Sequence, residues 1–402
     1  MARILFLTSR LPYPPREGHQ LRSWHLLKVL ASQHQVTLLS FLREEDDAGG
    51  LSMLRDTCAA VETFPIPAER SRLRLASALV RSLTTRTPFV AAKYASPALR
   101  ERLSVLARDS DLVHFDILPL MAHADCVPVG VPVAFNAHNV ESALALTRAG
   151  MESRFLHRRF LHSQHARLRG FEQAACRRAD AVLACSDDDL VQLQRMAPDT
   201  PMRVVPNGVD LDENHPADRP PAHPDRLVFV GQMGWFPNRD GVDWFLREIF
   251  PRILAVRPQT RFELVGKSDS LEIPADVSPS VIRAGFVPDL RPHVHDAAVY
   301  IVPLRAGSGT RLKVLEAMAL GKAIVTTHIG SEGIALEDGV SARYADDAEG
   351  FARAVVELLD DPQRAHELGA AARAAAESRY GWDAIGRDLL DFYAGLLSRA
   401  PQ

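Results

Sequence analysis

The feature that most constrains this fold is a repeated alternation between short apolar runs and longer stretches with helical spacing. Such alternation predicts parallel strands joined by helices, with helices on both faces of each sheet. In the first half of the chain the expected strands are Arg3–Thr8, Gln35–Phe41, Ala60–Ile66, Asp111–Ile117, Val131–Ala137, Ala181–Ser186 and Arg203–Pro206. In the second half they are Leu227–Gly231, Arg261–Val265, Val281–Phe286, Ala298–Pro303 and Ala323–Thr327.

Chain length and one irregular segment predict two domains. A chain of 402 residues is too long for a single hydrophobic core. The stretch Asp212–Arg226 is rich in proline and charge and has no periodicity, which predicts a linker. We therefore expect a first Rossmann-like domain over residues 1–211, a linker over 212–226 and a second Rossmann-like domain over 227–380, with a last helix within 381–402. Helices are expected, among other places, at Glu152–Arg178, Asp240–Val256, Leu290–Asp296, Thr310–Leu320, Ala348–Leu359, Gln363–Arg379 and Trp382–Leu397.

Composition excludes several classes of protein. Hydrophobic residues make up 47% of the chain and charged residues 24%, and the formal net charge is −3, so no nucleic-acid partner is expected. The four cysteines lack metal-ligand or disulfide-framework spacing, and we expect reduced thiols. No apolar run approaches the roughly 20 residues of a membrane span, and no signal peptide is recognisable. A cytoplasmic protein is the resulting expectation.

Two basic runs stand out in the first half. Residues 67–108 contain nine Lys and Arg against Glu69 and Glu101, and residues 148–178 contain eight Arg against Glu152 and Glu172. Such runs are usually solvated helix faces. The alternative is a surface for anionic lipid or for a lipid-diphosphate acceptor, which would place the protein peripherally at the inner face of a membrane.

The stretch VPLRAGSGTRLKVLEAMALGKAIV, residues 302–325, carries the clearest binding signal. A buried-strand run is followed by a glycine-rich turn and then by an amphipathic helix. Backbone amides at a helix N-terminus, with the cations Arg311 and Lys313 beside them, suit a diphosphate. The carboxylate of Glu316, one turn further on, suits paired hydroxyls such as those of a ribose. The predicted donor-binding residues here are Gly307, Ser308, Gly309, Thr310, Arg311, Lys313 and Glu316.

Polar groups also follow the predicted strands of the first domain. Gly18 lies where a helix begins after SRLPYPPRE, and a glycine there lets the backbone approach a phosphate or sugar. Asp116 ends the segment DLVHFD, and His138 lies in FNAHNVE. The carboxyl ends of parallel strands are where open α/β sheets bind ligands. An ordinary turn for Gly18 and structural roles for Asp116 and His138 remain the alternatives.

Together these segments resemble the retaining glycosyltransferases of family 4, which have the GT-B fold. The resemblance also covers ADAVLACSDDDLVQL, RVVPNGVDL and FVGQMGWFPNRDGVDWF, whose Gly231 and Gly234 end a strand. It implies two Rossmann-like domains that face each other across a cleft. The second would bind a nucleoside-diphosphate sugar, the first would present the acceptor, and the last helix would cross back to the first domain.

The resemblance further implies a metal-independent hexosyltransferase-type enzyme without a cofactor, in which the nucleotide-sugar is a substrate. Asp116, His138, Arg311 and Lys313 would be its catalytic residues, and Gly18, Gly231 and Gly234 would join the donor site. The chain departs from the family at two points. Ser308 stands where the family has the first Glu of its E-x7-E pattern, and Gln232 stands where many members have Arg.

Within the family, YPPREGHQLR, FNAHNVES and GSGTRLKVLEAMALGKAIVTT look most like bacterial sugar transferases of PEP-CTERM/exosortase-associated exopolysaccharide loci. A lipid-linked or polysaccharide acceptor follows from this resemblance. The alternatives are a GT-B sugar-nucleotide epimerase, a non-catalytic GT-B partner protein that binds nucleotide-sugar, and a GT-B phosphorylase. The sequence identifies neither the sugar and base of the donor, nor the acceptor, the linkage or the oligomeric state.

Overall fold

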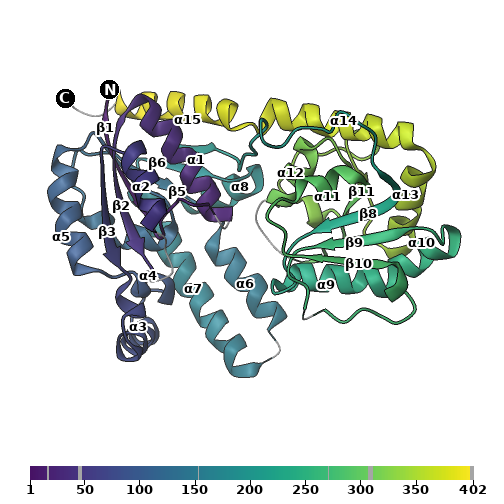
Figure 1. Ribbon diagram of the computed structural model, residues 1–402. Helices are drawn as coiled ribbons and strands as arrows, with labels where there is room; N and C mark the ends of the chain where they lie inside the picture. The colour runs from purple at the N-terminus through teal and green to yellow at the C-terminus, as the bar shows by residue number, and fades with distance from the viewer. Residues whose placement is uncertain (16–17, 44–47, 153, 270, 307–310, 399–402) are drawn as a thin grey trace. The chain divides into compact units, whose positions relative to one another are not determined.

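The computed structural model describes residues 1–15, 18–43, 48–152, 154–269, 271–306 and 311–398. The chain forms two compact units, which Figure 1 shows. One combines Met1–Pro206 with Gly386–Gln402, and the other is Asn207–Ile385. The domain boundaries therefore differ from those expected at 211 and 380. The segment 212–226, expected as a linker, belongs to the second unit, and its last residues begin a strand.

The first unit is built on a parallel sheet whose strand order is β3-β2-β1-β4-β5-β6-β7. Strand β1 lies between β2 and β4, with Ile4 opposite both Val36 and Leu112. Every pairing along the sheet is parallel, as the alternating pattern predicts. The strands are β1 (Arg3–Thr8), β2 (Gln35–Leu42), β3 (Ala60–Pro65), β4 (Leu112–Phe115), β5 (Val133–Asn136), β6 (Ala181–Ala184) and β7 (Met202–Val204).

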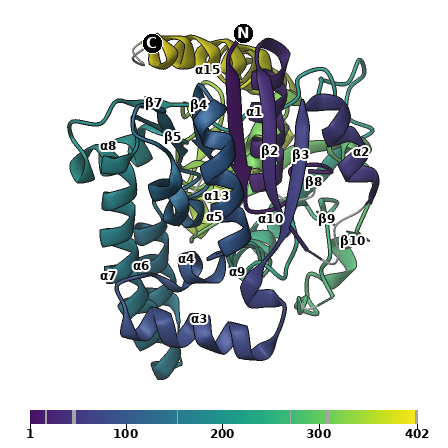
Figure 2. The same cartoon turned by 90° about the vertical axis from the view of Figure 1, so that its left-hand side faces the viewer.

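Helices connect these strands, and Figure 2 shows them around the sheet. The expected helix Glu152–Arg178 is present as α7, which begins at Phe155, and a further helix, α6, precedes it. At α8 the hydroxyl of Ser186 accepts a hydrogen bond from the Asp189 amide at 3.1 Å, so Ser186 is the N-cap of this helix. The helices are α1 (Gly18–Gln33), α2 (Ala48–Thr57), α3 (Arg72–Thr84), α4 (Phe89–Lys93), α5 (Pro97–Leu106), α6 (Glu141–Met151), α7 (Phe155–Arg178) and α8 (Asp187–Met196).

The second unit repeats this winding in a parallel sheet of order β10-β9-β8-β11-β12-β13. Its strands are β8 (His223–Val230), β9 (Arg261–Val265), β10 (Val281–Gly285), β11 (Ala297–Val302), β12 (Ala323–Thr326) and β13 (Arg343–Tyr344). The two-residue strand β13 was not expected, since it is too short to show a periodicity. The helices are α9 (Phe236–Trp244), α10 (Phe250–Val256), α11 (Arg291–Asp296), α12 (Leu312–Ala319), α13 (Ala348–Asp360) and α14 (Pro362–Arg379). The last helix, α15 (Trp382–Leu397), begins in the second unit and belongs to the first unit from Gly386 onward.

The expected single helix Asp240–Val256 is interrupted by a π-helical turn at Phe245–Ile249. Pro251 lies in the first turn of α10, directly after it. Because proline has no N–H to donate to the preceding turn, the backbone cannot continue as a regular α-helix there. Across the described residues, no helix combines the length and the apolar character needed to cross a membrane.

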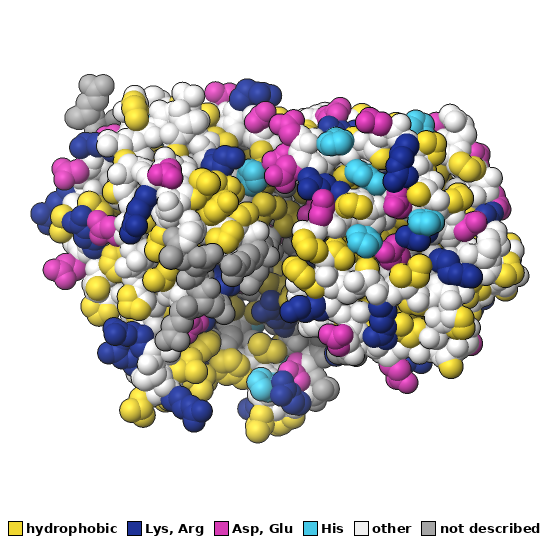
Figure 3. Space-filling model, viewed as in Figure 1, with side chains coloured by type: hydrophobic (Ala, Val, Ile, Leu, Met, Phe, Trp, Pro, Cys, Tyr) yellow, Lys and Arg dark blue, Asp and Glu magenta, His cyan; other side chains and the backbone are white. Residues whose placement is uncertain are grey.

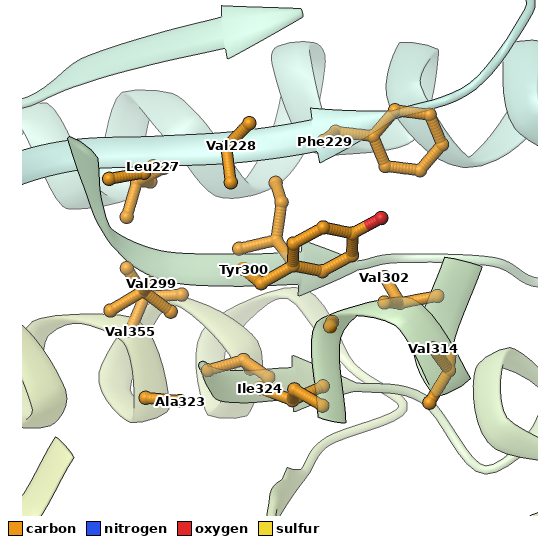
Figure 4. Packing of buried hydrophobic residues seen from close by; sticks show 14 of the residues in the cluster. Leu227, Val228, Phe229, Val299, Tyr300, Val302, Val314, Ala323, Ile324 and Val355 are labelled. Carbon is orange, nitrogen blue, oxygen red and sulfur yellow. The ribbon is translucent and has the colours of Figure 1, made fainter. Parts of the chain in front are cut away.

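The core of the second unit forms around its central strands. Figure 4 shows apolar side chains of β8, β11 and β12 meeting Val314 of α12 and Val355 of α13. Both helix residues are fully buried. Val314 therefore anchors α12 to the sheet, and this fixes the polar residues that lie beside it on the same helix.

The close packing of α14 in this unit can be tested by comparing two glycine-to-alanine substitutions. Gly369 of α14 lies so near the turn before β12 that an added Cβ would be 2.1 Å from the carbonyl oxygen of Gly321. We expect Gly369→Ala to lower the free energy of unfolding by about 1–3 kcal/mol, because the backbone must move. Gly170→Ala, in an exposed part of α7 with nothing within 4 Å, should instead raise it by about 0.5–1 kcal/mol. Urea denaturation of both variants checks the opposite signs, and equal effects would contradict the packing argument.

Candidate functional site

In both sheets the order of the strands reverses beside the first strand of the unit. In the first unit this point lies between β1 and β4, and in the second it lies between β8 and β11. Helices that follow the two neighbouring strands leave toward opposite faces, so their loops separate above the carboxyl ends. Ligands of open α/β sheets bind at such points, and polar residues gather at both of them here.

Lys313, the second residue of α12, is the central group at the reversal point of the second unit. Its ammonium donates a hydrogen bond to Asn238 Oδ1 at 2.7 Å and lies 4.1 Å from the centre of the Phe229 ring. Asn238, in the first turn of α9, in turn donates to the carbonyl oxygen of Gln232 at 3.0 Å. The end of β8, the start of α9 and the start of α12 are thus joined through one amide side chain.

Gly231 makes this close approach possible. A Cβ at residue 231 would lie 2.7 Å from Asn238 Nδ2 and 2.8 Å from Lys313 Nζ. The neighbouring Gly266 has a φ of +124°, and its own Cβ would lie 2.3 Å from the carbonyl oxygen of Gly231. Only glycines fit at both positions, because any side chain would displace the backbone or the lysine.

Lys313 and Glu316 are both removed from water, and nearby charges offset only part of the effect of burial on their pKa values. Desolvation lowers the pKa of Lys313 to about 7, an effect to which Arg311 adds and which Glu316 opposes. Desolvation likewise raises the pKa of Glu316 to about 7, against the influence of Lys313. Within the described ranges, no hydrogen bond or ion pair of the Glu316 carboxylate is formed, and Lys313 donates to Asn238 alone. The site therefore holds one cation and one carboxylate that influence each other's pKa but form no ion pair among the described residues.

Arg311 precedes α12 and lies against the loop that follows β12. It donates to the carbonyl oxygen of Ile329 at 3.4 Å and lies 4.0 Å from a carboxylate oxygen of Glu332. Burial lowers the pKa of its guanidinium. The predicted donor-binding residues Gly307, Ser308, Gly309 and Thr310 lie outside the described residues. Gly234 is exposed after β8, and Arg239 is exposed on α9.

The first unit places Asp116 directly after β4, with its side chain buried among polar neighbours. Its carboxylate accepts hydrogen bonds from the hydroxyl of Ser23 and, at 2.8 Å, from Asn136 Nδ2. His138 Nε2 lies 3.3 Å and His114 Nε2 3.6 Å from the same carboxylate. Burial alone would raise the pKa of Asp116, but the two histidines outweigh burial and lower it. Asp116 is therefore an ionised group whose position is fixed from several directions.

Residues other than the predicted site residues complete this cluster. Arg22 of α1 donates to Asn136 Oδ1 at 2.7 Å and to the carbonyl oxygen of Val205 at 2.7 Å. His114 Nδ1 lies 2.5 Å from the hydroxyl of Tyr393, which comes from α15. The order of the sequence gives no signal for the Tyr393 contact, because 279 positions separate the two residues. His138, 9% exposed, is the least buried of the histidines here, and Gly18 is exposed at the first position of α1.

Metal-ligating side chains do not cluster in the residues that the structure describes. No group of three or more His, Cys, Asp or Glu side chains is arranged there as a metal site. The four cysteines are free thiols.

Two doubly wound parallel sheets, each with polar residues at its reversal point, define the GT-B class of glycosyltransferase folds. Solved structures of this class resemble the chain over nearly its whole length. Sucrose-phosphate synthase from Thermosynechococcus elongatus has a TM-score of 0.68 at 18% identity, with 98% of this chain and 99% of that one covered. Anabaena HepE, solved in complex with UDP, has a TM-score of 0.66 at 14% identity, with 98% and 100% covered.

Sequence comparison gives the family. The family model "Glycosyltransferase Family 4" matches residues 17–213, and "Glycosyl transferases group 1" matches residues 224–361. Together the two models cover most of the chain and support a glycosyltransferase of family 4. The phosphatidyl-myo-inositol mannosyltransferase of Mycolicibacterium smegmatis is 29% identical over 202 residues, which are 47% of this chain and 50% of that protein. The chain thus spans about half the length of this curated relative, and 62% of the glycogen synthase of Mycobacterium tuberculosis.

The Asp116 cluster gives a prediction about stability. We expect Asp116→Asn to lower the free energy of unfolding by about 1.5–3 kcal/mol, because a buried charged acceptor of several hydrogen bonds is lost. Since the folded state lowers the pKa of Asp116, its contribution is present above the unfolded value of 3.8 and is lost as the pH falls below it. The difference between wild type and variant should therefore narrow in acid.

Urea denaturation over a range of pH checks this prediction. Asp388→Asn is the matched control, because Asp388 forms an exposed ion pair with Arg203 at 2.7 Å. Its effect should stay below about 1 kcal/mol. Equal losses in the two variants would show that the cluster has no special role in stability.

Proposed function

We propose that this protein is a retaining glycosyltransferase that moves a sugar from a nucleoside-diphosphate sugar to an acceptor. The observation that carries the proposal is the pair Lys313 and Glu316 at the reversal point of the second unit, neither of which forms an ion pair among the described residues. A diphosphate supplies the anion that Lys313 lacks, and the hydroxyls of a ribose supply donors for Glu316. The UDP bound in the HepE structure, a protein of the same fold, supports a nucleotide as ligand.

The chemistry follows from charge that develops on the leaving group. When the bond between the anomeric carbon and the diphosphate oxygen breaks, negative charge grows on the diphosphate. Lys313 and Arg311 stabilise that charge, and the fixed Asn238 keeps the ammonium in place before the reaction begins. In the mechanism implied by the family, the acceptor hydroxyl attacks from the same face as the departing group, and its proton passes to the phosphate. No metal or cofactor enters this scheme.

Roles for the first unit form part of the proposal. His138, at the carboxyl end of β5, contacts the sugar or the acceptor, while the more buried Asp116 holds His138 and Asn136 in position. Gly18, Gly231, Gly234 and residues 307–310 join the donor site. The acceptor is a lipid-linked sugar or a polysaccharide in exopolysaccharide synthesis, of the kind found in PEP-CTERM/exosortase-associated loci. Support for this setting comes from the resemblance of the three segments quoted above.

Binding of the donor can be tested by thermal shift with UDP, GDP, ADP and their sugar conjugates. A ligand that binds only the folded protein stabilises it by about 2.7 kcal/mol at one hundred times its Kd. We expect one nucleotide series to raise the melting temperature of the wild type. Arg311→Ala and Glu316→Ala should each remain folded and lose most of that shift.

Arg353→Ala, an exposed residue of α13, is the control and should keep the full shift. Wild-type shifts in both site variants would contradict the site assignment. A nucleotide that binds without any sugar transfer would support a non-catalytic partner protein, and an isomerised donor without a glycosylated product would support an epimerase.

The low pKa of Lys313 gives a second prediction for the same site. A bound diphosphate favours the ammonium form and raises the lysine pKa from about 7, so binding above that pH should take up a proton. The affinity for the nucleotide should fall as the pH rises from 7 to 9, by at most about tenfold per unit. Lys313→Arg should remove this pH dependence, because arginine stays charged throughout.

Calorimetry in buffers of different ionisation enthalpy measures the proton uptake. Lys313→Met should bind more weakly than Lys313→Arg and should take up no proton. Equal proton uptake in the wild type and both variants would rule out Lys313 as the titrating group.

A further inference from the structure

Helix α3 exposes an unusual amount of apolar surface. Of its residues, Ala78 and Ser82 are buried, and the others are exposed. Leu73 is 84% exposed, Val80 57% and Leu83 50%. With about 100° of rotation per residue, these three side chains fall on one side of the helix. The apolar stripe therefore faces away from the unit to which the helix belongs.

The structure holds α3 firmly in this orientation. Ala78 packs in a small cluster with Ala68 and Ala92, and Phe89 packs against this cluster. The hydroxyl of Ser71 caps the N-terminus by accepting a hydrogen bond from the Arg74 amide at 3.2 Å. At the other end, Arg167 of α7 donates to the carbonyl oxygens of Leu83 and Thr85 at 3.0 and 3.1 Å. These contacts satisfy both ends of the helix while its stripe stays uncovered.

The charge around the stripe is entirely basic. Arg72, Arg74 and Arg81 are exposed on α3, and residues 70–100 contain no Asp or Glu. The acid that precedes them, Glu69, is paired with Lys93 at 2.6 Å. A basic helix with an exposed apolar stripe is the pattern of helices that lie in the plane of a membrane interface.

The start of α7 presents the same combination of side chains. Phe155 is 59% exposed and Leu156 80%, and the guanidinium of Arg159 lies 5.6 Å from the centre of the Phe155 ring. Residues 153–171 contain no Asp or Glu, and the preceding Glu152 is paired with Arg154 at 3.2 Å. Figures 1 and 2 place α3 and the start of α7 at the same end of the first unit. In Figure 3 apolar and basic side chains lie together over this end.

We propose that this end of the first unit binds an anionic membrane surface, with α3 in the plane of the interface. We call it the basic apolar surface; it consists of Arg72, Leu73, Arg74, Val80, Arg81, Leu83, Arg154, Phe155, Leu156, Arg158 and Arg159. The apolar side chains enter the boundary between headgroups and acyl chains, and the arginines reach the lipid phosphates. An anionic membrane surface accounts for both the apolar stripe and the arginines around it. The sequence pattern alone favours a solvated helix face, whereas the uncovered leucine side chains favour the membrane. The inference does not depend on the proposed transferase activity.

Vesicle sedimentation without any sugar donor tests the proposal. The full chain should sediment with vesicles of equal parts phosphatidylcholine and phosphatidylglycerol, and much less with phosphatidylcholine alone. Arg74→Ser combined with Arg81→Ser should weaken binding to the anionic vesicles by roughly thirtyfold, at about fivefold per arginine. Leu73→Ser combined with Val80→Ser should weaken binding to both kinds of vesicle. All four residues are exposed, so these variants should fold as the wild type does.

The matched control is Val129→Ser combined with Val340→Ser, two exposed valines outside the basic apolar surface. It should bind vesicles as the wild type does. Wild-type protein that stays in the supernatant with anionic vesicles would overturn the proposal, and so would binding that survives the Leu73 and Val80 changes. Self-association without lipid that these two changes abolish would also overturn it, in favour of a contact between copies of the chain.

Discussion

The parallel pairing of β1 with β4, and of β8 with β11, is the constraint on which the rest of the structure depends. At these two pairs the winding reverses, and the connecting helices must leave on opposite faces of the sheet. In each unit the connecting helices therefore leave the carboxyl ends of these two strands uncovered. Backbone and side chains there can contact groups outside the core. Asp116 in the first unit and Lys313 in the second both lie at such a place. The location of each candidate site is thus a consequence of strand order.

The two reversal points differ in how far the protein compensates the charge that it places there. Around Asp116 the protein supplies a serine, an asparagine and two histidines, and the pKa of the carboxylate falls. Around Lys313 it supplies one amide and the face of a phenyl ring, and the pKa of the ammonium falls to about 7. A compensated charge fixes the local structure, whereas an undercompensated one favours a ligand that brings the missing charge. The same contrast explains why the first cluster gives a prediction about stability and the second gives a prediction about binding.

Most of the fold could be predicted from the sequence because its strands are buried and bounded by turn signals. Each expected strand exists, and most ends agree within two or three residues. The helices were harder to predict where a break lies inside a continuous helical pattern. The π-helical turn at Phe245–Ile249 interrupts such a pattern, whereas the expected helix Glu152–Arg178 is present as α7 from Phe155. The domain boundaries also differ, because the proline-rich segment 212–226 packs with the second unit despite its irregular composition.

The candidate sites were predictable only in part. Arg311, Lys313 and Glu316 could be found because a glycine-rich turn, two cations and a carboxylate lie close together in the sequence. Asn238 could not be predicted in this way, because its role depends on a hydrogen bond from the ammonium of Lys313, which lies 75 positions away in the sequence. Tyr393 illustrates a further consequence. Its hydroxyl contacts His114, so the first unit needs the end of the chain to complete its interior. During synthesis the second unit, which is continuous, has all its residues before the first unit does. The first unit, most of which is synthesised first, is therefore the last to have all of its residues available for folding.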